Sequence, residues 1–187
     1  MSDWYESTAD PNLEQGDILP TLTALTPTMG NHEVEDEREG TISAIAEETA
    51  GIILTQTCDL AQGKVDQLLV AQVVTWSDLI ATESAKGNEL VKSRKFRQKL
   101  IEGNIPNLSL LHENSGPPAL EWSVVNFRRL YSLPVQYVEL RVRHTGDRLR
   151  LRSPYREHLA QAFARYIMRV GLPHSADGFK DYSPPRK

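Results

Sequence analysis

Two apolar runs near the middle of the chain give the clearest pattern of hydrophobic and polar positions. Residues 52–54 are Ile-Ile-Leu and end in polar residues, and residues 68–74 repeat this apolar character after a Gln-Gly-Lys connection. Short apolar runs rich in β-branched residues, bounded by polar connections, are typical of buried strands. We therefore predict two adjacent strands at the centre of a sheet.

Strand patterns return at residues 108–111 and 122–127, and a sharper alternation follows them. Val138 and Val142 alternate with polar residues, and Leu149 and Leu151 do the same after a Thr-Gly-Asp segment. Residues on one face of a strand recur at every second position, so the pattern predicts a β-hairpin over residues 138–152. The polar face of this hairpin would carry Arg141, Arg143, Arg148, Arg150 and Arg152.

The last regular element that the sequence predicts is a helix with well-marked ends. Ser153 can cap its first turn and Pro154 suits the first helical position, while Gly171 and Pro173 follow its last turn. Apolar residues recur at helical spacing between these ends and define one stripe that faces the sheet. The residues expected to pack there are Leu159, Phe163 and Ile167.

These elements indicate one domain of the α+β class, mostly β with helices, over residues 14–172. Residues 1–13 are expected to be a flexible lead, with order starting at Gly16, and residues 173–187 a flexible tail. Residues 26–40 mix Pro, Gly and charged residues, which favours a loop, and residues 77–103 carry helix-start signals, which predict a helical insertion. We expect a bent antiparallel sheet or small barrel with this insertion and a C-terminal helix.

Length and composition limit the class of protein. The 187 residues are 40% hydrophobic and 25% charged, which suits one globular domain with an ordinary core. Apolar runs fall far short of the roughly 20 residues that span a bilayer, and the start lacks a signal-peptide pattern, so we expect a cytoplasmic protein that binds no membrane. One cysteine forms no internal disulfide, and no Cys/His spacing offers a zinc site. We expect neither a metal nor a cofactor; the oligomeric state stays open.

Charge is distributed unevenly along the chain, although the net charge is only −4. Residues 1–50 hold 12 acidic residues and one arginine, whereas residues 51–187 hold 13 acidic residues and 20 lysines and arginines. The two parts therefore carry charges of −11 and +7. Every cationic side chain from Arg128 to Arg169 is an arginine, whose planar fork suits two-point contacts with phosphate or carboxylate.

The arginine face of the predicted hairpin has three interpretations. With Arg128 and Arg129 it could neutralise several phosphates of a nucleic acid, and nearby tyrosines could stack on unpaired bases. It could equally bind a protein partner, or pair with the acidic N-terminal part of the same chain. Because the whole chain is acidic and repels polyanions at long range, we favour the protein-facing interpretation.

Cys58 follows the first apolar run, between Thr57 and Asp59, and also has two interpretations. The thiol could be a nucleophile, with Thr57 as a second catalytic group, if a histidine approached it. An unpaired cysteine is more often a small buried residue, and the neighbouring Asp59 disfavours a thiolate. We expect a buried, slowly reacting thiol.

Order of elements and a short motif give a resemblance to a known family. Gly16-Asp17-Ile18 opens a predicted strand, a charged loop follows, and residues 52–57 form an apolar strand that ends in small polar residues. This arrangement resembles the SH3-like barrel of the PemK/MazF toxin superfamily, which implies an SH3-like domain and endoribonuclease activity. That family carries a basic loop, with an arginine that serves RNA cleavage, where residues 33–48 of this chain are acidic with only Arg38.

A second resemblance is to uncharacterised bacterial proteins, some of which lie among defence or toxin–antitoxin genes. Residues 55–60, 125–134 and 153–166 carry it. Three hypotheses follow. We favour a non-catalytic binding or regulatory module of a bacterial toxin–antitoxin or antiviral defence complex, with a protein partner and with nucleic acid as a possible ligand. The alternatives are a PemK/MazF-like endoribonuclease and a Cys58-dependent enzyme or thiol sensor.

Overall fold

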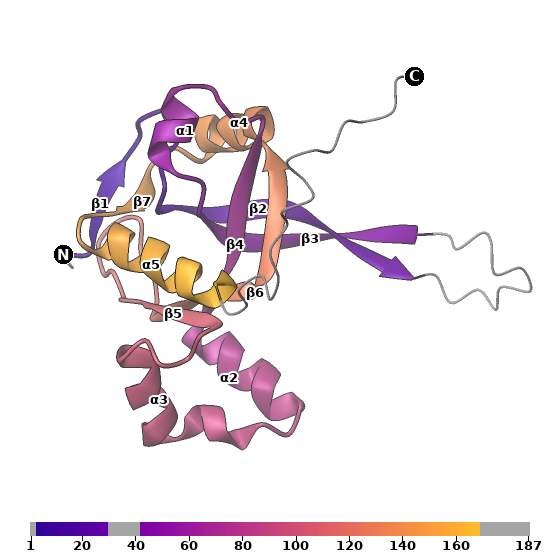
Figure 1. Cartoon of the computed structure of the whole chain (residues 1–187), viewed down its shortest axis with the longest axis vertical. Coiled ribbons are helices and arrows are strands. Elements are labelled where there is room, and N and C mark those ends of the chain that lie inside the picture. Colours follow the sequence, from indigo (N-terminus) through magenta and orange to yellow (C-terminus); the bar gives the residue numbers. More distant parts are fainter. Residues whose placement is uncertain (1–2, 30–41, 169–187) are drawn as a thin grey trace, which may run out of the picture.

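The computed structural model describes residues 3–29 and 42–168. Its strands are β1 (Tyr5–Thr8), β2 (Asp17–Met29), β3 (Ile42–Ile53), β4 (Gln67–Thr75), β5 (Leu108–Leu111), β6 (Ser123–Pro134) and β7 (Arg148–Leu151). Its helices are α1 (Thr57–Ala61), α2 (Trp76–Ala85), the 3₁₀ turn η1 (Glu89–Lys92), α3 (Arg94–Ile101), α4 (Val135–Thr145) and α5 (Tyr155–Ile167). Figure 1 shows their arrangement.

The described strands form a single antiparallel sheet in the order β1-β7-β2-β3-β4-β6-β5. The predicted α+β class, with a bent sheet, a helical insertion and a C-terminal helix, is confirmed, and the sheet is open rather than closed into a barrel. Its register shifts between Leu19 and Leu22 and between Ala71 and Gln72, and bulges of this kind bend a strand. At Gly51 a Cβ would lie 2.6 Å from Val70 Cγ1 and 2.8 Å from Leu22 Cδ1, so a glycine here leaves room for these two core side chains to pack over the strand.

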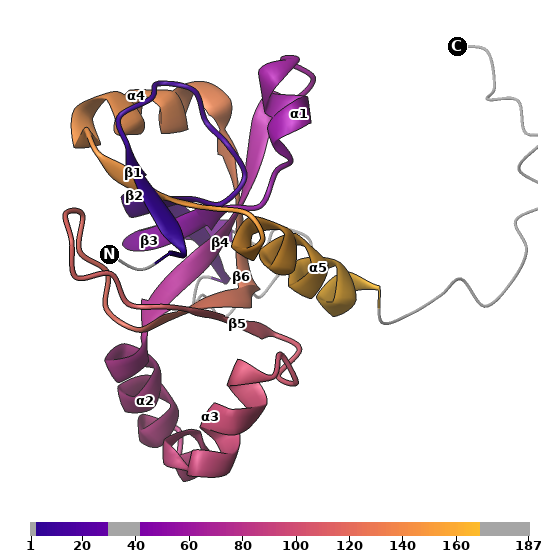
Figure 2. The same cartoon turned by 90° about the vertical axis from the view of Figure 1, so that its left-hand side faces the viewer.

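Both faces of the sheet are covered by helices. Neighbouring residues on a strand point to opposite faces, so each strand contributes side chains to both cores. Ile52 joins the core under α5, where Leu159 is buried, whereas Ile53 joins the core under α4, where Val138 and Val142 are buried. Figure 2 shows α4 and α5 on different sides of the strands. A third cluster lies between α2, η1, α3 and the β5–β6 edge, so the helical insertion has a small core of its own.

The predicted hairpin over residues 138–152 is wrong in its first half, because this part forms helix α4. Val138 and Val142 are four positions apart, which suits a helix as well as a strand. Together with Val135 they pack on the sheet, whereas Leu140 is 54% exposed. The second half does form a strand, β7, with Leu149 and Leu151 in the core as the alternation predicts. Arg141 and Arg143 therefore do not share a face with the arginines of β7.

The prediction that order begins only at Gly16 is also wrong. Residues 5–8 form β1, which pairs with β7. Tyr5 is 5% exposed and its hydroxyl donates to the carbonyl oxygen of His112. Burial raises the pKa of this hydroxyl well above its usual range. A four-residue strand whose partners lie at least 140 positions away gives no local signal.

The two segments expected to be a loop and a tail are only partly described. Residues 26–29 continue β2, which with β3 forms a two-stranded ribbon that projects from the sheet in Figure 1. Residues 30–41 lie outside the described part of the chain, as do the predicted end of the last helix at Gly171 and the tail from residue 173. Within α5, Leu159 is buried and Phe163 half-buried, but Ile167 is 60% exposed and does not pack as predicted.

Replacing Phe163 by alanine tests the packing of α5. The Phe163 ring lies 5.5 Å, between centroids, from that of Phe127 in the core. Because Phe163 is only half-buried, we expect Phe163→Ala to lower the free energy of unfolding by about 2–3 kcal/mol, below the range for a fully buried ring. Ile167→Ala on the exposed side is the control and should change it by less than about 0.5 kcal/mol. Equal losses in urea unfolding would contradict this packing.

Candidate functional site

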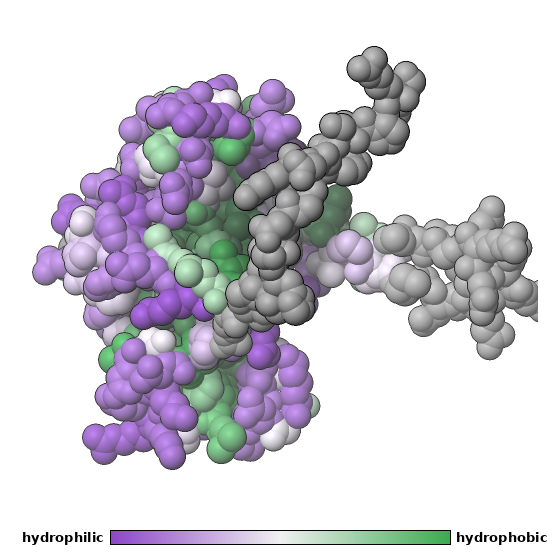
Figure 3. Space-filling view, in the orientation of Figure 1, coloured by the Kyte–Doolittle hydropathy of each residue, from purple (hydrophilic) through white to green (hydrophobic). Residues whose placement is uncertain are grey.

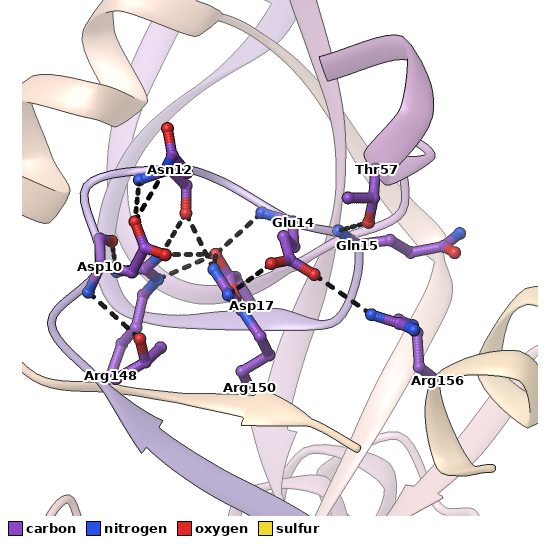
Figure 4. A network of polar contacts seen from close by, with 10 residues as sticks. Asp10, Asn12, Glu14, Gln15, Asp17, Thr57, Arg148, Arg150 and Arg156 are labelled. Atoms are coloured by element: carbon purple, nitrogen blue, oxygen red, sulfur yellow. Dashed lines mark hydrogen bonds and ion pairs between the residues drawn. The ribbon is translucent and has the colours of Figure 1, made fainter. Parts of the chain in front are cut away.

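Two arginines of the predicted binding face, Arg148 and Arg150, belong to a buried ion-pair network (Figure 4). Asp17 is fully buried at the start of β2 and pairs with Arg148 at 2.8 Å and with Arg150, both on β7. Arg148 is 1% and Arg150 5% exposed. Burial by itself lowers the pKa of Arg150, but its hydrogen bonds to Asp17 and the neighbouring carboxylates raise it overall, so the guanidinium stays charged.

The same two arginines hold the loop that connects β1 to β2. Arg148 donates to the carbonyl oxygens of Asp10 and Asn12, each at 2.7 Å, and Arg150 donates to that of Asn12 at 2.8 Å. Glu14 accepts from Arg150 at 2.6 Å and from Arg156 of α5 at 3.2 Å. The network thus ties four segments together, and its guanidinium groups are already occupied.

The arginines predicted to form one binding face are therefore separated by the structure. Arg148 and Arg150 pair with carboxylates of the acidic N-terminal part, which is one of the three interpretations, and the acids are Asp17 and Glu14. The remaining members of the set lie on different elements. Arg128, Arg129, Arg143 and Arg152 are exposed, and Arg141 is half-buried and donates to the carbonyl oxygen of Thr21.

Cys58 is exposed, so the expected buried thiol is wrong. It lies on α1, a five-residue helix of which no residue is buried. Its sulfur lies 3.6 Å from Gln56 Oε1 and 3.9 Å from Asp59 Oδ1. The Thr57 hydroxyl accepts a hydrogen bond from the backbone N–H of Gln15 at 3.1 Å.

No histidine among the described residues is hydrogen-bonded to the thiol. His112 and His144 bond to backbone carbonyl oxygens, and His158 contacts the Tyr155 ring. His32 and His174 lie outside the described residues. Residues 3–29 and 42–168 contain no group of three His, Cys, Asp or Glu side chains that could hold a metal ion. Among these residues there is also no helix long and apolar enough to span a membrane.

Two hollows flank the C-terminal end of α3, on the side of the sheet edge formed by β5. The larger is a cleft of about 660 Å³ between α5 and the turn after α3. Its aromatic and polar walls include Trp4, Tyr155, His158, Arg165 and Asn104. The cleft is thus mixed in character, with a cation and an imidazole on the α5 side.

Aromatic rings run from this cleft along the adjoining surface. Trp4 stacks on Tyr155 with centroids 4.2 Å apart and contacts His112 at 5.7 Å. His112 in turn lies 4.3 Å from Trp122. Trp4 and Tyr155 cover one face of each other, and the His112 ring is tilted against Trp4 and Trp122, so the four rings hold one another in place.

The second hollow, which we call the insertion groove, is smaller and almost wholly apolar. It encloses about 250 Å³ and is lined by Trp76, Trp122, Leu100, Ile101, Leu110 and Arg97. The backbone N–H of Trp76 donates to the carbonyl oxygen of Trp122 at 2.7 Å, which fixes the two tryptophans beside each other. Ile101 is 66% and Trp122 38% exposed, so apolar area reaches the surface here.

The sequence contained only weak signals for the insertion groove. Trp76 directly follows β4 and Trp122 directly precedes β6, so each tryptophan stands at the end of a strand. These strands pair in register at Thr75 and Ser123, which brings the two tryptophans together. Neither residue belongs to a motif, and their convergence depends on strand pairing between segments about fifty residues apart.

Comparison of the chain with protein-family models, with curated proteins and with solved structures finds no match. The function is therefore argued from the geometry of these surfaces.

The network around Asp17 should be the most sensitive polar site of the fold. Asp17→Asn removes the charge that two buried guanidinium groups share, and breaking a buried pair in this way costs about 3–5 kcal/mol. Glu157→Gln is the control, since Glu157 pairs with Arg156 at the surface, where the expected loss is below about 1 kcal/mol. Urea unfolding measures both variants. A loss for Asp17→Asn as small as that of the control would show that the network does not stabilise the fold.

The exposure of Cys58 predicts its reactivity. We expect a disulfide exchange reagent to label the Cys58 thiol of the folded chain at a rate within about tenfold of the rate for the urea-unfolded chain. The thiol is already accessible, so unfolding does not limit the reaction. Labelling that proceeds only at the rate of global unfolding would contradict the exposed position.

Proposed function

We propose that this chain is a non-catalytic binding module that docks a protein partner at the insertion groove. The observation that carries the proposal is an apolar groove, open to solvent, with two tryptophans and an arginine in its wall. Contiguous apolar surface on a globular protein marks an interaction site more often than chance, and Trp and Arg are enriched among the residues that dominate binding energy.

The size of the groove supports a protein side chain as its occupant. At about 250 Å³ it is smaller than the roughly 300–1,000 Å³ of pockets that enclose drug-sized ligands and cofactors. One or two large apolar side chains from a partner would fill it. Since Arg97 supplies the charged group among the lining residues, the groove has little with which to orient a polar small molecule.

The groove is also built on rigid elements. Val91 and Leu100 are buried beneath it, together with Leu108 of β5 and Val124 of β6. Trp76 contacts the ring of Phe96 on α3 at 6.3 Å, so its position is fixed by two helices. A surface held in place in this way loses little conformational entropy on binding.

The biological setting belongs to the proposal as well. The resemblance of residues 55–60, 125–134 and 153–166 to bacterial proteins encoded among defence or toxin–antitoxin genes supports a role in such a complex, in the bacterial cytoplasm. The endoribonuclease alternative needs a convergent basic cleft near Thr57. It is not favoured, because Arg148 and Arg150 are committed to Asp17.

A second candidate function rests on the exposure of Cys58. An exposed thiol on a short helix is accessible to an oxidant or to a second thiol, which a thiol sensor needs. This candidate predicts that Cys58→Ser abolishes the biological effect of the chain. The binding-module proposal predicts that Cys58→Ser retains partner binding.

Ile101→Lys tests the binding proposal. The substitution places a charge in the groove at a side chain that is 66% exposed, so it should leave the fold intact. The partner is first captured from the host with the full chain and then purified. Calorimetry should show that it binds Ile101→Lys at least about tenfold more weakly than the unaltered chain, as expected for the loss of one interface anchor.

The matched control is Leu90→Lys, an aliphatic residue of the same insertion that is 73% exposed and does not line the groove. This variant should bind like the unaltered chain. If Leu90→Lys and Ile101→Lys bind equally well, the groove is not the docking site.

A further inference from the structure

Helix α3, which forms one wall of the insertion groove, carries four cations. They are Arg94, Lys95, Arg97 and Lys99, and all are exposed. Within the described residues none of the four makes an ion pair or a side-chain hydrogen bond. The other two cations of the insertion do, since Lys86 pairs with Glu83 at 3.1 Å and Lys92 with Glu89 at 2.6 Å.

The acids of the insertion are all engaged elsewhere. Glu83 and Glu89 hold the two lysines just named, and Glu83 also accepts from Asn88 at 2.7 Å. Asp78 accepts from the Thr75 hydroxyl, and Glu102 accepts from Gln98 and Asn104. The positive charge of α3 therefore has no carboxylate partner in the described part of the chain.

This charge pattern opposes the stability of the helix that bears it. Arg94 and Lys95 occupy the first turn, where the helix dipole favours acids, and the first turn contains no acid. Lys95 and Lys99 repel each other at i, i+4, and Arg94 and Arg97 repel each other at i, i+3. Ser93 caps the helix and Lys99 suits its last turn, but no acid offsets the cations of the first turn. A departure of this kind from local stability rules is typical of a functional surface.

The cations and the groove share one face of α3. Arg94, Arg97 and Ile101 follow one another at i, i+3 and i+7, so they form a single stripe along the helix. Arg97 and Ile101 both line the groove. A segment that inserts an apolar side chain between the two tryptophans would thus run beside the guanidinium groups.

We propose that the occupant of the groove is an acidic, amphipathic segment of a partner protein, with large apolar residues in the groove and carboxylates against Arg94 and Arg97. This inference rests on the proposed function and names the chemistry of its partner. A protein segment is favoured over a nucleic acid because the groove is apolar and Trp4 and Tyr155, on the adjoining surface, already stack on each other. The arginine forks suit bidentate contact with carboxylates.

Selection from a random peptide library displayed on phage tests the inference without assuming a sequence. The unaltered full chain should select peptides in which Asp or Glu stands beside large apolar residues. The Arg94→Glu/Arg97→Glu variant should lose this acidic preference, and a synthetic peptide from the first selection should bind it at least about tenfold more weakly.

Lys64→Glu/Arg143→Glu is the matched control, because both residues are exposed and lie on or next to α1 and α4, at the other end of the molecule from α3 in Figure 1. It makes the same change in net charge and should select and bind like the unaltered chain. Equal weakening in both double variants would show a general charge effect and would overturn the inference.

Three other results are distinguishable. Selected peptides that lose binding to Ile101→Lys but show no acidic enrichment would overturn this inference and leave the proposed function standing. Peptides that bind Ile101→Lys unchanged would overturn the proposed function itself. Binding of a uridine-rich RNA oligonucleotide that is tighter than any peptide and is lost in Arg94→Glu/Arg97→Glu would assign the helix to nucleic acid instead.

Discussion

The buried pairing of Asp17 with Arg148 and Arg150 is the interaction on which the architecture depends most. One carboxylate at the start of β2 holds two guanidinium groups of β7, and those groups hold the backbone of the loop before β2. Taking three charges out of water is expensive unless each finds partners, and here the carbonyl oxygens and Glu14 supply them. The arrangement therefore fixes how the N-terminal strand, the last strand and α5 meet. It also explains why Arg148 and Arg150, which the sequence places on a predicted binding face, are buried.

The helical insertion stands at the opposite end of the molecule from α1 and α4 (Figures 1 and 2). It has its own small core, so its outer surface can carry features that the main sheet does not need. Figure 3 shows apolar side chains reaching the surface among the polar ones in the part of the molecule where Figure 1 places the insertion. Separation of the stabilising network from the binding surface lets each be altered without the other.

The sequence predictions are correct where an element depends on local interactions and wrong where it depends on residues far apart in the sequence. The strand predicted over residues 68–74 is confirmed, because this run is shorter than a typical helix and its valines favour a strand. Val138 and Val142 fit a strand and a helix equally, and only packing beneath the sheet selects the helix. The pairing of Arg148 with Asp17 joins positions more than 130 apart, and the groove depends on two strand ends that meet in the sheet. No pattern in a short stretch of sequence predicts the ion pair or the groove.

Hydrogen–deuterium exchange of the full chain, alone and with its captured partner, tests whether the partner docks at the insertion groove. Bound partner should slow amide exchange in residues 94–101 and in the segments around Trp76 and Trp122, where the insertion groove lies. Exchange in the loop of residues 9–16 and in α4 should stay unchanged, because the ion-pair network already holds this loop and α4 lies at the other end of the molecule. Protection confined to that loop or to α4, with none in residues 94–101, would show that the partner binds away from the groove.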